Sequence, residues 1–134
     1  EVVLSQGETI WINATLNSSL AENETPDQIT VRKLGDVNER SLSKEVWTDF
    51  TFVADGDAKY VIVKCTAKQN GDYMFFCEND NVNRLSVYNS CVLEQEFSGG
   101  PDMCWMVVYA GESCYLKIDL NADVPDLRVT IIRN

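Results

Sequence analysis

The chain has 134 residues, of which 45% are hydrophobic and 24% are charged, a composition typical of a globular protein. This length predicts a single domain over residues 1–134 that can bury a core without a metal. The net charge of −10 excludes nucleic acid as a main ligand and disfavours anionic membranes, and no apolar run is long enough to span a bilayer.

Short apolar segments with a period of two predict an all-β fold, because Gly, Asn, Asp and Pro separate them about every ten residues. We expect an antiparallel β-sandwich that is jelly-roll-like and stabilised by disulfides. The predicted strands, in chain order, are Thr9–Leu16, Ile29–Lys33, Thr48–Val53, Tyr60–Ala67, Tyr73–Glu78, Arg84–Tyr88, Cys91–Glu96, Cys104–Tyr109, Cys114–Leu120 and Leu127–Arg133.

Glycosylation signals crowd the N-terminal region. Three Asn-x-Ser/Thr triplets begin at Asn13, Asn17 and Asn23, in a chain that also has five cysteines. Together these features favour an exported, N-glycosylated protein, secreted or extracellular. The alternative is that the triplets are polar, turn-rich stretches without glycans.

The segment from Cys65 to Cys77 carries the strongest turn signal, Asn70-Gly71, between two runs rich in β-branched and aromatic residues. This pattern predicts a tight hairpin. In that hairpin Cys65 faces Cys77 across the ladder and can form a disulfide. The side chains expected on the same side of the sheet are Val61, Val63 and Phe75.

The other three cysteines leave several pairings open. We favour a Cys91–Cys104 disulfide, which closes the loop that contains Ser98-Gly-Gly-Pro101. Cys114 is then a buried free thiol or an intermolecular link, and a different pairing also stays open. A second predicted hairpin, at Ala110–Ser113, puts a buried face on the following strand, with Cys114, Leu116, Ile118 and Leu120.

The three tryptophans differ in their expected surroundings. We expect Trp47 and Trp105 in the core, since a β-sandwich commonly buries one or two tryptophans. Trp11 has the opposite parity to Ile10 and Ile12, which predicts an exposed side chain.

The chain ends, about residues 1–8 and 126–134, are rich in β-branched and apolar residues. They are interpreted either as the first and last strands of the sandwich or as strands that pair with neighbouring molecules. The second interpretation predicts self-association by strand addition.

Catalytic chemistry has little support in the sequence. Histidine is absent, which removes the commonest general base, the usual nucleophilic triads and most zinc sites. Neither a Gly-rich phosphate loop nor a Gly-x-Ser-x-Gly elbow is found. A carboxylate pair stays open, but we predict no catalytic residue and expect a protein that is not an enzyme.

Calcium is the one metal with candidate ligands, and no other cofactor is expected. The sequence has Val124 where a calcium loop needs Gly, and Thr130 where it needs the closing Glu. A solvated acidic loop is the alternative. The candidate oxygen donors are Glu78, Asp80, Asp119, Asn121 and Asp123.

Four segments, Leu42–Val53, Ala54–Val63, Asn70–Phe75 and Met103–Ile118, resemble in order the strands and turns of the pre-peptidase C-terminal (PPC-like) domains. The resemblance spans Leu42–Leu120. Two departures are Asn-Gly-Asp in place of Asp-Ala-Asp and the additional Cys65 and Cys77. The resemblance implies a small β-sandwich that helps to fold, anchor or bind, as these non-catalytic modules of exported proteins do. Some members bind calcium, but their ligands do not map onto this chain.

These observations together predict a non-catalytic structural or adhesive glycoprotein, a subunit or module of a surface or filament-type assembly that is joined by strand pairing. The alternative is a carbohydrate- or protein-binding accessory module of a secreted hydrolase. An exposed aromatic face would favour the alternative.

Overall fold

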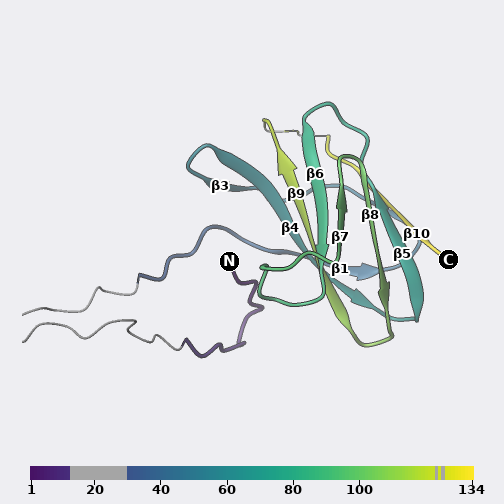
Figure 1. Cartoon of the computed structure of the whole chain (residues 1–134), viewed down its shortest axis with the longest axis horizontal. Coiled ribbons are helices and arrows are strands. Elements are labelled where there is room, and N and C mark those ends of the chain that lie inside the picture. Colours follow the sequence, from purple (N-terminus) through teal and green to yellow (C-terminus); the bar gives the residue numbers. More distant parts are fainter. Residues whose placement is uncertain (13–29, 123, 125) are drawn as a thin grey trace, which may run out of the picture.

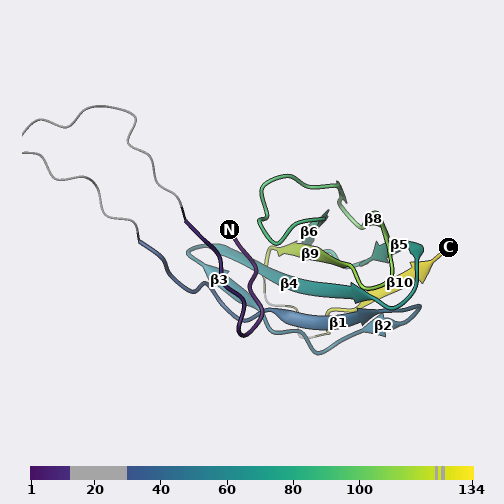
Figure 2. The ribbon, with the colours of Figure 1, turned by 90° about the horizontal axis from the view of Figure 1, so that it is seen from below.

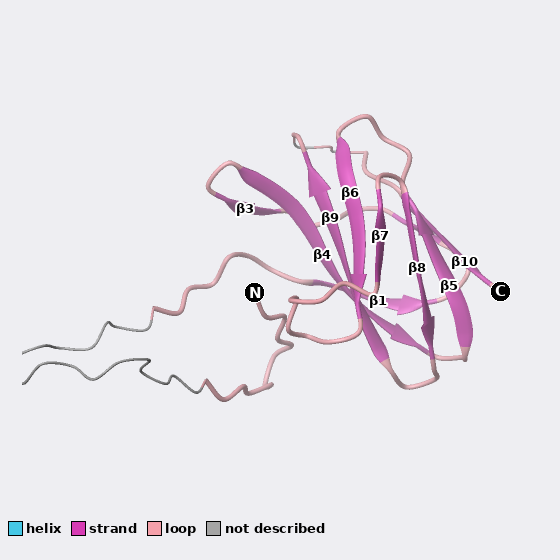
Figure 3. Ribbon diagram, viewed as in Figure 1, coloured by secondary structure: helices cyan, strands magenta, loops and turns pink. Residues whose placement is uncertain are grey.

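The computed structural model describes residues 1–12, 30–122, 124 and 126–134. Within these residues it contains strands and no helix (Figure 3), which confirms the predicted all-β class. No described segment could therefore cross a membrane as an apolar helix.

Ten strands are present in the described part of the chain (Figure 1). Their bounds are β1 Asn38–Leu42, β2 Val46–Trp47, β3 Val53–Asp55, β4 Ala58–Ala67, β5 Gly71–Phe76, β6 Val82–Tyr88, β7 Ser98–Gly100, β8 Met103–Val108, β9 Ser113–Leu120 and β10 Val129–Arg133.

The strands form two mostly antiparallel sheets that pack as the layers of a sandwich (Figure 2). The large sheet has the order β1-β4-β9-β6-β7, with β3 also paired to β4. The small sheet has the order β2-β10-β5-β8. The pairing of β1 with β4 is the parallel one.

The core lies between the two sheets and takes alternate residues from each of them, as the period of two requires. Inward-facing side chains of β4, β6 and β9 meet those of β5, β8 and β10. The largest fully buried side chains include Tyr73, Phe75, Leu85, Leu116, Ile118, Leu127 and Ile131. Trp47 is also buried, as predicted, and its indole N–H donates to Glu45 Oε1 over 2.7 Å.

Six predicted strands are confirmed with small shifts of their ends, namely β4, β5, β6, β8, β9 and β10. The described parts of the segments predicted over residues 9–16 and 29–33 are not strands. Residues 91–96 form a loop that holds an isolated bridge between Val2 and Val92. The prediction over residues 48–53 is wrong except at its last residue, where β3 begins.

Strand β1 was missed because its sequence, Asn-Glu-Arg-Ser-Leu, is almost entirely polar. Its position depends instead on Asn38, which is buried. The Asn38 side-chain amide donates to the carbonyl oxygens of Thr51 and Ile62, and its oxygen accepts from the Thr51 N–H over 2.8 Å. This one side chain therefore holds β1 against both β4 and the loop that contains Thr51.

The predicted hairpin between Cys65 and Cys77 is wrong, because β4 and β5 belong to different sheets. The turn at residues 68–70 crosses from one layer to the other, and Asn70 Oδ1 accepts from the Ala110 N–H over 2.8 Å. The turn around Gly111, which has a φ of 87°, also crosses between the layers. Both connections are therefore arches, which join strands of different sheets, and not hairpins. The side chains predicted to lie on one face of a single sheet instead face each other across the core.

Strand β10 lies inside the small sheet, with β2 on one side and β5 on the other. A neighbouring molecule could pair with β10 only if β10 first left its own sheet.

The N-terminal residues lie against the loop that follows β6. Val3 is buried, and its N–H donates to the carbonyl oxygen of Cys91 over 2.8 Å.

Candidate functional site

The outer face of the small sheet, which we call the open face, is the most unusual surface of the described structure. It consists of the outward side chains of β2, β5, β8 and β10, and most of these are apolar. Its half-exposed residues on β8 are Met103, Trp105 and Val107, at 37%, 42% and 40% of full exposure. Val46 on β2 is exposed to a similar degree.

Strand register makes this open face continuous. One row across the sheet holds Val46, Thr130, Phe76 and Met103. The next row holds Ile132, Met74 and Trp105. Residues that lie opposite each other on neighbouring strands have Cβ atoms only about 5 Å apart. The apolar side chains therefore form one patch and are not scattered singly.

Trp105 was predicted to lie in the core, and this prediction is wrong. Strand β8 alternates between buried Cys104, Met106 and Val108 and their exposed neighbours. The Trp105 ring meets the Phe97 ring edge-on, with 5.4 Å between centroids and 88° between planes. Ser98 Oγ also accepts the Trp105 backbone N–H over 3.0 Å. These two contacts hold the indole on the surface in a defined position.

A shallow groove of about 390 Å³ lies at one end of the open face. It is lined by Phe76, Glu78, Arg128, Thr130 and Ile132. The groove combines an aromatic ring and an aliphatic side chain with one acid and one base. It is suited to an amphipathic partner segment.

The outer face of the large sheet, which we call the covered face, is built in the opposite way. Its apolar side chains are buried under segments of the chain itself. Val3, Val53, Tyr60, Ile62 and Tyr115 form a second, smaller core there. The segments that pack on it contribute Leu34, Val37, Tyr88, Cys91 and Leu93.

Polar contacts fasten the N-terminal segment along β1 and β4, where Figure 2 shows it in purple. Lys64 Nζ donates to Ser5 Oγ over 2.8 Å and forms a 3.1 Å ion pair with Glu8. The N–H of Ser5 and then Lys64 lower the pKa of Glu8, and the bond to Glu8 raises the pKa of Lys64. Both groups are therefore charged at neutral pH.

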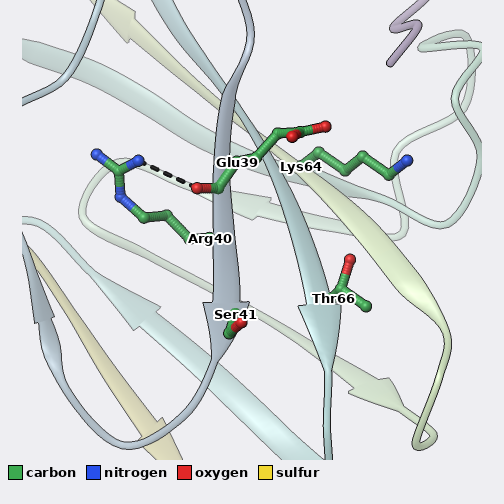
Figure 4. A pocket seen from close by; sticks show the side chains of 5 residues that line it. All are labelled: Glu39, Arg40, Ser41, Lys64 and Thr66. Atoms are coloured by element: carbon green, nitrogen blue, oxygen red, sulfur yellow. Dashed lines mark hydrogen bonds between the residues drawn. The ribbon is translucent and has the colours of Figure 1, made fainter. Parts of the chain in front are cut away.

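A polar pocket of about 260 Å³ lies between β1 and β4, lined by Glu39, Arg40, Ser41, Lys64 and Thr66 (Figure 4). Glu39 and Lys64 extend side by side, whereas Arg40 extends the other way and donates to the Glu39 carbonyl oxygen over 3.1 Å. Glu39 also accepts from Ser5 Oγ over 2.8 Å. The charges of this pocket are engaged with the chain itself, which makes it a weaker binding site than the open face.

All five cysteines are free thiols in the structure, so neither predicted disulfide is observed. Cys65 and Cys77 lie on strands of different sheets or next to them, and the register partner of Cys65 is Cys114. Burial raises the pKa of Cys77 to about 11 and that of Cys104 to about 12. Cys91 is partly exposed and packs against the covered face.

Three of the calcium candidates lie in two neighbouring loops, which are joined by a 2.8 Å bond from the Asn121 N–H to the Asn81 carbonyl oxygen. Asp119 lies on β9, close to Lys117 Nζ at 3.7 Å. Glu78, Asp80 and Asn121 lie in the loops, and Asp123 is outside the described residues. Among the described acids and thiols, no three come together as a metal site.

The predicted glycosylation sites Asn13, Asn17 and Asn23 also lie outside the described residues. Trp11 is almost fully exposed, as predicted.

The open face was not predicted as a site, because the residues on both sides of β8 are apolar. The sequence signal that could have revealed it is the run Met-Cys-Trp-Met-Val-Val, which contains no polar residue to mark a solvent side.

No family model matches the chain, and no curated protein matches it. The resemblance to the PPC-like domains therefore stays a prediction.

Proposed function

We propose that this protein is a non-catalytic, extracellular structural or adhesive glycoprotein that joins an assembly through its open face. The observation that carries the proposal is the continuous apolar patch of Met103, Trp105, Val107 and Val46 on the small sheet. Secretion, glycosylation, disulfides and a jelly-roll arrangement of the sandwich are parts of the same proposal.

The size of the open face supports a contact role. Strands β5 and β8 have six residues each, β10 has five and β2 has two. At about 3.4 Å per residue and about 4.8 Å per strand they give a face of roughly 300 Å². Patches of about this size are often functional on monomers. A stable interface takes about 800 Å² from each partner, so the contact must extend past the face onto its neighbours, Phe97 and Tyr109.

Strand pairing fits this proposal at β8. This strand ends the small sheet, whereas β10 has neighbours on both sides. Strand β8 contains neither a charged residue nor a proline. Those are the usual devices that stop edge strands from pairing with another chain. Strand addition at β8 would extend the small sheet and place a partner strand beside Trp105 and Val107, once the bond from the Trp105 N–H to Ser98 Oγ on this edge is released.

The test is self-association, measured by sedimentation velocity over a series of protein concentrations. The wild-type protein should form oligomers as concentration rises. Val107→Lys should shift this equilibrium at least about tenfold toward monomer, since it places a charge in the apolar contact. The matched control is Val31→Lys, which changes an exposed valine outside the small sheet and should associate like the wild type.

A second candidate function is a carbohydrate- or protein-binding accessory module, and the Phe97–Trp105 pair favours it. Exposed aromatic rings with a fixed orientation are common at binding surfaces. A monomer at all concentrations that binds immobilised glycans, with binding lost in Trp105→Ala, would support this candidate and contradict the first.

A further inference from the structure

Two buried thiols lie opposite each other in the large sheet. Cys65 on β4 and Cys114 on β9 are partners in the antiparallel register. Both side chains are completely buried, in the core between the sheets. Partners in one row of a ladder project to the same face, so the two sulfur atoms lie side by side.

The spacing of this row suits a covalent bond. Opposite residues of an antiparallel pair have Cα atoms about 4.5–5.5 Å apart. Disulfides span Cα distances of about 4.4–6.8 Å. The Cβ atoms of opposite residues are about 4.5–5.5 Å apart and those of a disulfide about 3.8 Å apart, so the bond requires only a small local approach of the two strands.

We propose that Cys65 and Cys114 are joined by a disulfide when the protein folds in an oxidising compartment. This cross-link would fasten β4 to β9, the two longest strands of the large sheet. It replaces both pairings expected from the sequence, and it does not depend on the open face.

The other thiols are less suitable partners. Cys104 belongs to the same core but lies on β8, in the opposite layer. Facing sheets pack about 10 Å apart, whereas thiols with Cα atoms more than about 7 Å apart cannot be bridged without backbone movement. Cys77 follows β5 in that same opposite layer, and Cys91 packs outside, on the covered face.

The reaction needs a disulfide oxidant, such as glutathione disulfide or a protein disulfide. One cysteine thiolate attacks a sulfur of the oxidant, releases one thiol and leaves a mixed disulfide. The second thiolate then displaces the other half of the oxidant. Two electrons pass to the oxidant, which becomes two thiols, and the cysteines lose two protons. The product is lighter by two hydrogen atoms.

The burial of the two thiols determines at which stage of folding the disulfide forms. Burial and the adjacent Cys114 raise the pKa of Cys65 well above its ordinary value. In the folded state Cys65 therefore offers almost no thiolate to an oxidant, and neither sulfur is accessible from solvent. The bond should form while β9 is docking on β4, before the core closes.

The test is disulfide mapping of the wild-type protein after refolding from the reduced, unfolded state in a glutathione redox buffer. Free thiols are then alkylated, and the protein is digested with trypsin and a glutamyl endopeptidase. The cleavage sites that place the five cysteines on five peptides include Lys64, Lys68, Glu78, Glu94, Glu96 and Glu112. The expected result is one linked pair, the peptides of Cys65 and Cys114, with the other three cysteines alkylated.

Variants sharpen the result. Cys104→Ser should keep the link, and Cys114→Ser should leave Cys65 alkylated. Oxidation of the protein that has already folded with reduced thiols should be at least about tenfold slower than during refolding. A link of Cys104 to Cys114, of Cys65 to Cys77 or of Cys91 to Cys104, or alkylation of all five, would overturn the proposal. These outcomes are read from peptide masses, so they do not depend on whether the protein assembles.

Discussion

Both outer faces of this sandwich carry apolar side chains, but those of the large sheet are buried and those of the small sheet are partly exposed. The large sheet carries Tyr60, Ile62 and Tyr115 outward and buries them under the N-terminal segment and the loop at residues 88–93. The small sheet carries Met74, Trp105 and Ile132 outward and leaves them partly in solvent. An apolar outer face is stable when the chain supplies its own cover. The uncovered face is the one expected to meet a partner.

The largest difference between the two faces is expected when one isoleucine is shortened on each of them. Ile62→Ala removes a side chain that is 3% exposed, and such changes in a packed site cost about 2–5 kcal/mol of the free energy of unfolding. Ile132→Ala on the open face should cost less than half as much, because its side chain is already partly solvated. Urea denaturation of both variants measures the difference. Equal losses would mean that the two faces do not differ in packing.

Alkaline pH tests the covered face through Tyr60. Burial, and then the Glu1 carboxylate, raise the pKa of Tyr60 to about 12. The unfolded chain releases this proton near pH 10, so the contribution of Tyr60 to stability is full below pH 10 and falls as pH rises from 10 toward 12. The loss is at most ~2–3 kcal/mol. Tyr60→Phe should flatten this part of the stability curve, and an unchanged slope would contradict the assignment.

A smaller effect is expected from releasing the cover itself. Val3→Asp places a charge where the side chain is buried, so the N-terminal segment should detach and expose Ile62. The cost is limited to the docking free energy of that segment, roughly 1–2 kcal/mol. Hydrogen exchange at the backbone amide of residue 3, which bonds to the Cys91 carbonyl oxygen in the wild type, should speed up. The neighbouring Val2→Asp, at a half-exposed position, serves as the control and should leave exchange unchanged.

In β4 and β5 local pattern was enough to identify which residues are buried, but not which strands are neighbours. Val61, Val63, Cys65 and Phe75 are all in the core, as their parity predicts. The alternation of buried and exposed residues depends on one strand alone. It can therefore be predicted correctly even when the pairing of the strands is predicted wrongly. The turn at Asn70-Gly71 has the same local chemistry in a hairpin and in an arch, and the choice between them depends on packing that lies far away in sequence.

The candidate site was harder to predict for a different reason. In β8 every residue is apolar, so hydrophobicity could not tell Trp105 from Met106. The cover over the large sheet could not be predicted either, since the loop at residues 88–93 and the N-terminal segment have no regular period. Asn38 shows the same limit, because its three hydrogen bonds to Thr51 and Ile62 join parts of the chain that only the fold brings together.

The place of β10 has a consequence for how this protein is made. In chain order β10 is the last of the described strands, yet it lies between β2 and β5 in the small sheet. On a ribosome the large sheet can assemble as soon as β9 has emerged, whereas the small sheet must wait for residue 133. Until then Phe75 and Trp47 lack the strand that joins them. The nascent chain therefore exposes half of its core until β10 has emerged, and this is the interval in which it most needs a chaperone.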